Sequence, residues 1–116
     1  MKYLFILNDT PYGSERTYNG LRLANSLAGR EGAEVLVFLM GDAVGCGVAG
    51  HTTPTGYYNI ERMLKGLARK GVRIGLCGTC LDARGIQAEY LADGGARSTM
   101  EELTSWTEAA DRVLVF

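Results

Sequence analysis

The sequence has no apolar run long enough to cross a membrane and almost no net charge. Its first apolar run, residues 3–7, is far shorter than a signal-peptide core or a membrane span, and it leads directly to Asn8 and Asp9. Twelve basic and thirteen acidic residues leave a formal charge of −1, so the chain lacks the attraction of a basic domain for nucleic acid or anionic lipid. These absences predict a cytoplasmic protein with no membrane or nucleic-acid partner, which binds a small molecule or another protein.

Cysteine and proline are also scarce. Three cysteines are an odd number, and in a reducing compartment they are reactive, metal-binding or buried thiols rather than a disulfide framework. Pro11 and Pro54 are the only prolines, and both precede the C-x-x-C pair of Cys77 and Cys80. A thioredoxin-like protein places a cis-proline after its cysteine pair. The sequence therefore does not support that fold.

What the chain does contain is an alternation of strand and helix patterns. Four short apolar runs bounded by polar residues or glycine are typical of strands buried on both faces, at residues 2–8, 33–40, 72–77 and 111–116. Residues 96–98 are a further short strand candidate. Helical patterns cover residues 14–29, beginning at Ser14, and residues 57–70; near the C-terminus Ser98 and Glu101 form a candidate capping box.

This alternation requires βαβ crossovers and hence a parallel sheet with helices on both faces. A chain of 116 residues that is 47% hydrophobic has the size and composition of one globular domain. We therefore predict a single domain over residues 1–116 with a three-layer α/β/α fold, flavodoxin-like in general architecture. Its sheet is expected to be mainly parallel, with four to five strands.

The carboxyl ends of parallel strands lie on one edge of the sheet, where ligands bind. The three cysteines and the only histidine are all predicted to lie at this edge. The first strand brings Asn8, Asp9 and Thr10 there, the second Asp42, Cys46 and His51, and the third Cys77, Thr79 and Cys80. The glycine-rich segment 41–56 is the one long connection, and long loops in compact domains are often functional.

Cys77 stands out because it ends an apolar strand and a helix is expected to begin near residues 79–82. Free N–H groups at the start of a helix favour an anion and lower the pKa of a thiol placed there. Arg84 adds to this effect if it folds back toward the sheet edge. A thiolate of this kind is a nucleophile and an acceptor of sulfur as a persulfide.

Other kinds of site stay open on the residues alone. Cys77 and Cys80 have the spacing of a dithiol redox pair. Together with Cys46 and His51 they offer three sulfurs and a nitrogen for zinc, although the spacing of Cys46 and His51 is loose for a structural site. The segment "NDTPYGSERT" is a weak candidate phosphate or nucleotide site, because it lacks the glycine spacing of the known motifs.

The whole chain resembles the DsrE/DsrF-like family, which includes small sulfur-relay proteins of the TusBCD type. The resemblance is carried by "NDTPYGSERTYNGLRLANSL", "VFLMGDAV", "LCGTCLDARGI" and the closing "ADRVLVF". In sulfur-transferring members, a cysteine at the end of the third strand carries a persulfide. The resemblance therefore points to Cys77, and it implies assembly into homotrimers or hexamers. Cys80 is a departure, because many relatives have one cysteine in this segment.

These observations predict a cytoplasmic sulfur carrier that accepts sulfane sulfur on Cys77 and passes it to a partner thiol. Such a protein acts as a sulfurtransferase rather than a conventional enzyme, needs no cofactor or metal, and has donor and acceptor proteins as partners. Cys80 either resolves the persulfide or tunes it, and the remaining candidate contacts to the sulfur or its donor are Asn8, Asp9, Thr79, Arg84, Cys46 and His51. The alternatives are an oligomer that binds a small anion or metal without catalysis, and a C-x-x-C redox protein.

Overall fold

The computed structural model describes residues 1–54 and 57–116, and the end of the predicted glycine-rich segment, residues 55–56, lies outside them. The elements in chain order are β1 (Lys2–Leu7), α1 (Arg16–Ala28), β2 (Glu34–Leu39), the 3₁₀ helix η1 (Gly41–Gly47), α2 (Ile60–Arg69), β3 (Arg73–Cys77), α3 (Gly78–Ala83), the 3₁₀ helix η3 (Ala88–Tyr90), β4 (Gly95–Ser98), α4 (Met100–Ala109) and β5 (Arg112–Val115). Within the described residues, none of the helices has the length and apolar character needed to cross a membrane.

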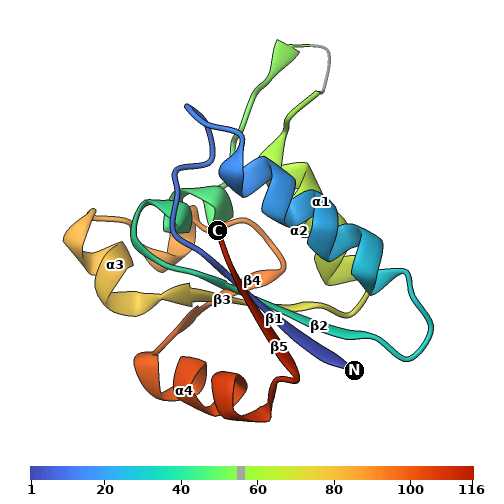
Figure 1. The fold of residues 1–116 in the computed structure, drawn as a ribbon. Helices are drawn as coiled ribbons and strands as arrows, with labels where there is room; N and C mark the ends of the chain where they lie inside the picture. Colours follow the sequence, from blue (N-terminus) through green and yellow to red (C-terminus); the bar gives the residue numbers. More distant parts are fainter. Residues whose placement is uncertain (55–56) are drawn as a thin grey trace.

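All five strands form one parallel sheet in the order β4-β3-β2-β1-β5. This confirms the three-layer α/β prediction and the short strand expected at 96–98. Because parallel crossovers are right-handed, the direction of travel across the sheet decides which face each helix covers. The chain moves from β1 to β4 in one direction, so α1 and α2 share a face. It then returns to β5 beside β1, which places α4 on the opposite face (Figure 1).

On each face of the sheet, a helix packs closely against the strands. On the α1 side, Gly20 allows close approach, since a Cβ there would lie 2.9 Å from Leu7 Cδ2 and 3.1 Å from Phe116 Cγ. On the α4 side, the Trp106 ring packs edge to face on Phe38 with 5.9 Å between centroids. Along β2, residues 35–39 are all buried, so both faces of this strand are covered, as its continuous apolar sequence predicts.

The helix starts differ from the sequence predictions by one to three residues. The first helix begins at Arg16 instead of Ser14, because the Ser14 hydroxyl donates to Asp9 and orders the loop before the helix. In α2 the N-cap is Asn59, whose side chain accepts from the Arg62 N–H at 3.0 Å. For α4 the cap is Thr99, with Glu102 as its partner, so the predicted capping box of Ser98 and Glu101 was wrong by one position. Ser98 instead donates to the Glu102 carboxylate.

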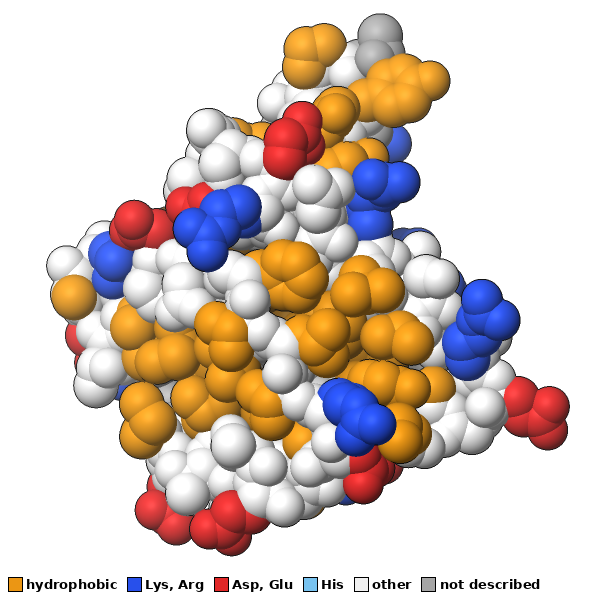
Figure 2. Space-filling model, viewed as in Figure 1, with side chains coloured by type: hydrophobic (Ala, Val, Ile, Leu, Met, Phe, Trp, Pro, Cys, Tyr) orange, Lys and Arg blue, Asp and Glu red, His pale blue; other side chains and the backbone are white. Residues whose placement is uncertain are grey.

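The face that carries α4 is incompletely covered near β5. This strand lies at the edge of the sheet, and it leaves Val113 and Val115 42% and 63% exposed. Figure 2 shows apolar side chains gathered over β5 and between α1 and α4. The protein therefore presents an apolar surface beside an unpaired strand edge, the kind of edge that pairs readily with another chain.

The contact between η1 and β3 gives a test of the packing beneath the sheet edge. Leu76 is fully buried, and a Cβ on Gly47 would lie 2.4 Å from its Cδ2, so Gly47→Ala should lower the free energy of unfolding by about 1–3 kcal/mol. Gly66, inside α2, has open space where a Cβ would lie, and Gly66→Ala should raise it by roughly 0.5–1 kcal/mol. Urea unfolding followed by Trp106 fluorescence measures both, and equal stabilities of the two variants would contradict this packing.

Candidate functional site

Cys77 lies where the sheet ends and a helix begins. It is the last residue of β3 and the N-cap of α3, so a helix does follow the cysteine, and it begins at Gly78, just before the predicted 79–82. Its side chain is only 6% exposed, and its Sγ lies 3.3 Å from the Thr79 hydroxyl. The sulfur is thus screened from water but has polar groups beside it.

Burial would by itself raise the pKa of the Cys77 thiol, but hydrogen bonds outweigh that effect. The donors are the side chains of Cys80 and Thr79 and the backbone N–H groups of the same two residues at the start of α3. Together they hold the pKa of Cys77 below the ordinary value for a cysteine. The site therefore favours a thiolate at Cys77.

Cys80 has the opposite tendency. Burial and the neighbouring Cys77 sulfur raise its pKa, while the Gly41 N–H and the Arg84 guanidinium act in the other direction without reversing the shift. The Gly41 N–H donates to Cys80 Sγ at 3.2 Å. The two cysteines are chemically unequal, because Cys77 is favoured as the anion and Cys80 as the protonated thiol beside it.

Arg84 folds back toward the edge of the sheet, which is the position from which it can favour a thiolate. Its Nη2 and Nε donate to Asp42 Oδ1 at 2.8 and 3.2 Å, and its Nη1 donates to the Cys80 carbonyl at 3.1 Å. Arg84 thereby ties the end of α3 to the start of η1. The guanidinium lies close enough to Cys80 to favour negative charge on its sulfur.

Arg97 is a charged neighbour of the thiols that sequence reasoning missed. Its guanidinium donates two bonds, Nη1 and Nη2 to the two oxygens of Asp82, at 2.7 and 2.8 Å. It also covers Gly78, where a Cβ would lie 2.9 Å from the guanidinium carbon. The negative charge of Cys77 stabilises the Arg97 cation and contributes to its raised pKa, after the larger effect of Asp82. The only sequence signal for this residue was its place in the short strand expected beside the third strand.

Asn8 and Asp9 lie at the end of β1 and organise loops there. The Asn8 side chain donates to the Phe116 carbonyl at 3.3 Å, which fastens the end of β5. Asp9 accepts from the Thr10 N–H at 3.0 Å and from the Ser14 hydroxyl, and these bonds lower its pKa. Because β1 is two strands from β3, these residues lie roughly 10 Å from the thiols along the sheet edge. Their side-chain hydrogen bonds within the described residues do not involve Cys77 or Cys80.

His51 has a structural hydrogen-bond arrangement. Its Nε2 lies 3.1 Å from the Gly45 carbonyl, an acceptor, so this nitrogen carries the proton. Its Nδ1 then accepts from the Tyr12 hydroxyl at 2.8 Å, and that hydroxyl accepts from the Ile60 N–H at 3.2 Å. The ring therefore joins the first loop, η1 and α2, and its bonding partners do not include the thiols.

Cys46, a candidate contact at the sheet edge, is fully buried in the structure. The 3₁₀ turn of η1 directs the side chain into the core, where burial raises the pKa of its thiol to about 12. It is therefore a packing residue rather than a reactive one. Among residues 1–54 and 57–116, no three His, Cys, Asp or Glu side chains come together as a metal site, so the zinc alternative has no ligand set there.

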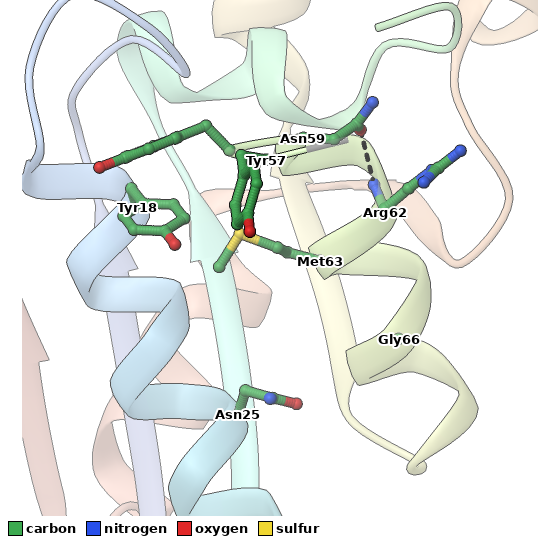
Figure 3. Close-up of a pocket in the computed structure, with 8 residues that line it drawn as sticks. Tyr18, Asn25, Tyr57, Asn59, Arg62, Met63 and Gly66 are labelled. Carbon is green, nitrogen blue, oxygen red and sulfur yellow. Dashed lines mark hydrogen bonds between the residues drawn. The ribbon is translucent and has the colours of Figure 1, made fainter. Parts of the chain in front are cut away.

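A separate groove of about 340 Å³ lies between α1 and α2. Figure 3 shows Tyr18 of α1 and Met63 of α2 directed into it. Tyr57 and Tyr58 also line it, and the rings of Tyr18 and Tyr58 pack with 4.2 Å between centroids. The residues that line it include no thiol, so this groove is separate from Cys77 and Cys80.

A family model described as "DsrE/DsrF-like family" matches residues 1–116. The chain belongs to the DsrE/DsrF-like family. Protein YchN of Escherichia coli K12 is 44% identical over 116 residues, 99% of this chain and 98% of YchN, and its crystal structure matches with a TM-score of 0.93. The uncharacterized protein MJ0989 of Methanocaldococcus jannaschii is 34% identical over the full length of both chains. MTH1491 of Methanobacterium thermoautotrophicum, 18% identical over 97% of each chain, has the same fold with a TM-score of 0.73.

Membership of the DsrE/DsrF-like family confirms the resemblance seen in the sequence and is consistent with a sulfur-relay role. The names of these relatives state no activity, so they bring none to this protein.

The Thr79 hydroxyl tests the electrostatics of the site. Replacing it in Thr79→Val removes one donor to the Cys77 sulfur, and the pKa of Cys77 should rise toward the ordinary value for a cysteine. The pH profile of Cys77 alkylation, read by peptide mass spectrometry, should shift to higher pH. Thr107→Val, which removes a hydroxyl bonded to Leu103 on α4, is the matched control and should leave the profile unchanged. A wild-type profile in Thr79→Val would contradict the assigned role of the hydroxyl.

Proposed function

We propose that this protein carries sulfane sulfur as a persulfide on Cys77 and passes it to the thiol of a partner protein. The observation that supports this most strongly is the set of donors around the Cys77 sulfur, which holds its pKa below the ordinary value at the end of β3. Membership of the DsrE/DsrF-like family agrees with it. Reduced thiols of this kind fit a protein that acts in the cytoplasm.

The transfer chemistry needs only the thiolate and a persulfide donor. The Cys77 thiolate attacks the outer sulfur of a donor persulfide, a new S–S bond forms to Cys77, and the donor leaves as a thiolate with the electron pair of the broken bond. A partner thiolate then attacks the outer sulfur in the same way and regenerates the Cys77 thiolate. The N–H and hydroxyl donors that favour negative charge at Cys77 remain beside the persulfide and are available to its outer sulfur.

Loading with sulfur tests the proposal directly. Anaerobic protein treated with a small-molecule persulfide donor in the presence of an acceptor protein thiol should transfer sulfur to that thiol. Cys77→Ala should abolish the transfer, because it removes the attacking sulfur. Intact-mass spectrometry of the acceptor measures the gain of one sulfur atom.

Cys46→Ala is the matched control, because it removes the fully buried thiol and should leave transfer unchanged. Transfer by Cys77→Ala at the wild-type rate would contradict the proposal. The absence of transfer to any thiol, with a folded protein, would do the same.

A dithiol redox function is the second candidate, because Cys77 and Cys80 adjoin each other with unequal pKa values, as in other C-x-x-C pairs. It predicts a disulfide that forms and is reduced reversibly without any sulfur being carried. Equilibration with glutathione buffers, followed by mass spectrometry, separates this function from sulfur transfer.

We further propose that the chain forms a homo-oligomer, a trimer or hexamer, through the surface that β5 leaves open. The unpaired edge and the exposed Val113 and Val115 support this, since a second copy would bury apolar area that the single chain leaves in water.

Substitution of Val115 tests the assembly. Val115→Lys places a charge where an apolar side chain would be buried, at a cost of several kcal/mol per interface, and should yield monomers in light scattering coupled to gel filtration. Tyr90→Lys, which changes an exposed residue of η3 away from β5, should keep the wild-type mass. A wild-type protein that is monomeric at micromolar concentration would overturn this proposal.

A further inference from the structure

The geometry of the first turn of α3 suits a bond between the two cysteines. Cys77 is the N-cap residue and Cys80 lies three residues further along. Residues three apart on a helix have Cβ atoms about 5–6 Å apart, and a disulfide requires Cβ atoms about 3.5–4.5 Å apart. The two side chains already lie within hydrogen-bonding reach of each other, and an adjustment of the first turn of the six-residue α3 would bring them to that distance.

Two groups beside Cys80 would stabilise its thiolate form. The Gly41 N–H donates to its sulfur at 3.2 Å. Arg84, fixed by Asp42 at 2.8 Å, holds its guanidinium on the Cys80 carbonyl at 3.1 Å. Both groups favour negative charge on Cys80, and a thiol that served only to pack the core would not need either.

What opposes ionisation of Cys80 is its burial and the charged Cys77 sulfur beside it. The second of these changes when Cys77 becomes a persulfide. The negative charge then lies on the outer sulfur, about 2 Å beyond Sγ. The Gly41 N–H and the Arg84 guanidinium remain in place, so loading Cys77 shifts the balance toward a Cys80 thiolate.

We propose that Cys80 is the resolving residue that unloads the Cys77 persulfide within the same chain when no acceptor thiol is present. The Cys80 sulfur attacks Sγ of Cys77, a Cys77–Cys80 bond forms, and the bond from Cys77 to the outer sulfur breaks. The outer sulfur leaves as HS⁻ with the electron pair and takes up the proton that Cys80 has lost. The two electrons that reduce it come from the two cysteine sulfurs, which end as a disulfide, so no outside oxidant or reductant is needed.

This inference rests on the proposed function, since Cys77 must first accept sulfur. In this proposal, Cys80 limits how long the protein holds the sulfur on Cys77. With an acceptor present the sulfur passes to the partner, and without one it is released as sulfide. The disulfide form cannot be loaded again until a dithiol reduces it.

A single-turnover experiment tests the assignment. Fully reduced protein is treated anaerobically with a small-molecule alkyl persulfide, excess donor is removed, and released sulfide and intact mass are followed together. The wild type should release about one sulfide per chain and finish two hydrogens lighter. Cys80→Ser should keep one extra sulfur on Cys77, because the serine hydroxyl is a poor nucleophile. Its rate of sulfide release should be about one tenth of the wild-type rate or lower. Arg84→Gln should slow the release several-fold, and Cys46→Ala should match the wild type.

The outcomes separate this inference from the proposed function. If the wild type and Cys80→Ser both retain the extra sulfur equally well, Cys80 does not resolve the persulfide, while the carrier function stands. If neither protein gains sulfur nor releases sulfide, the carrier function itself fails. Sulfide release from Cys80→Ser at the wild-type rate would also overturn the role of Cys80.

Discussion

The right-handed crossover of parallel strands is the constraint on which the arrangement of this molecule depends. It places α1 and α2 on one face of the sheet and α4 on the other, because the chain crosses from β1 to β4 and then returns to β5. It also brings the carboxyl ends of all five strands to one edge, where η1 meets the start of α3. The same return path leaves β5 as the edge strand opposite β4, with its apolar side chains exposed. The thiol site and the open surface are thus two consequences of one topology.

At that edge, hydrogen bonds to the two sulfurs determine how readily each cysteine ionises. Cys77 receives donors from Thr79 and from the first N–H groups of α3, whereas Cys80 receives a single backbone donor from Gly41. The difference lowers the pKa of Cys77 and leaves that of its neighbour raised, although they belong to one C-x-x-C motif. Arg84 acts on Cys80 and Arg97 on Cys77, and each guanidinium is held in an ion pair with its own aspartate. The site therefore has one cation near each thiol and no metal-ligand cluster among the described residues.

The sequence predicted the strands and the position of Cys77 well, because continuous apolar runs and a cysteine at a strand end are local signals. It could not place Arg97, because its position over Gly78 depends on the register of β3 with β4, which no local pattern encodes. Cys46 and His51 follow β2 in the chain, but the 3₁₀ turn of η1 directs one into the core and holds the other by hydrogen bonds to Tyr12 and Gly45. Local sequence thus indicates which residues reach the edge, and tertiary contacts decide which of them face the sulfur.

The proposed sulfur transfer depends on the two thiols of one motif ionising in a fixed order, Cys77 before Cys80. Nuclear magnetic resonance of protein labelled at the cysteine β-carbons measures this most directly, because each sulfur reports its own titration regardless of its accessibility to reagents. We expect a Cys77 midpoint below the ordinary value for a cysteine and a Cys80 midpoint above it. A reversed order, or two midpoints at the ordinary value, would contradict it.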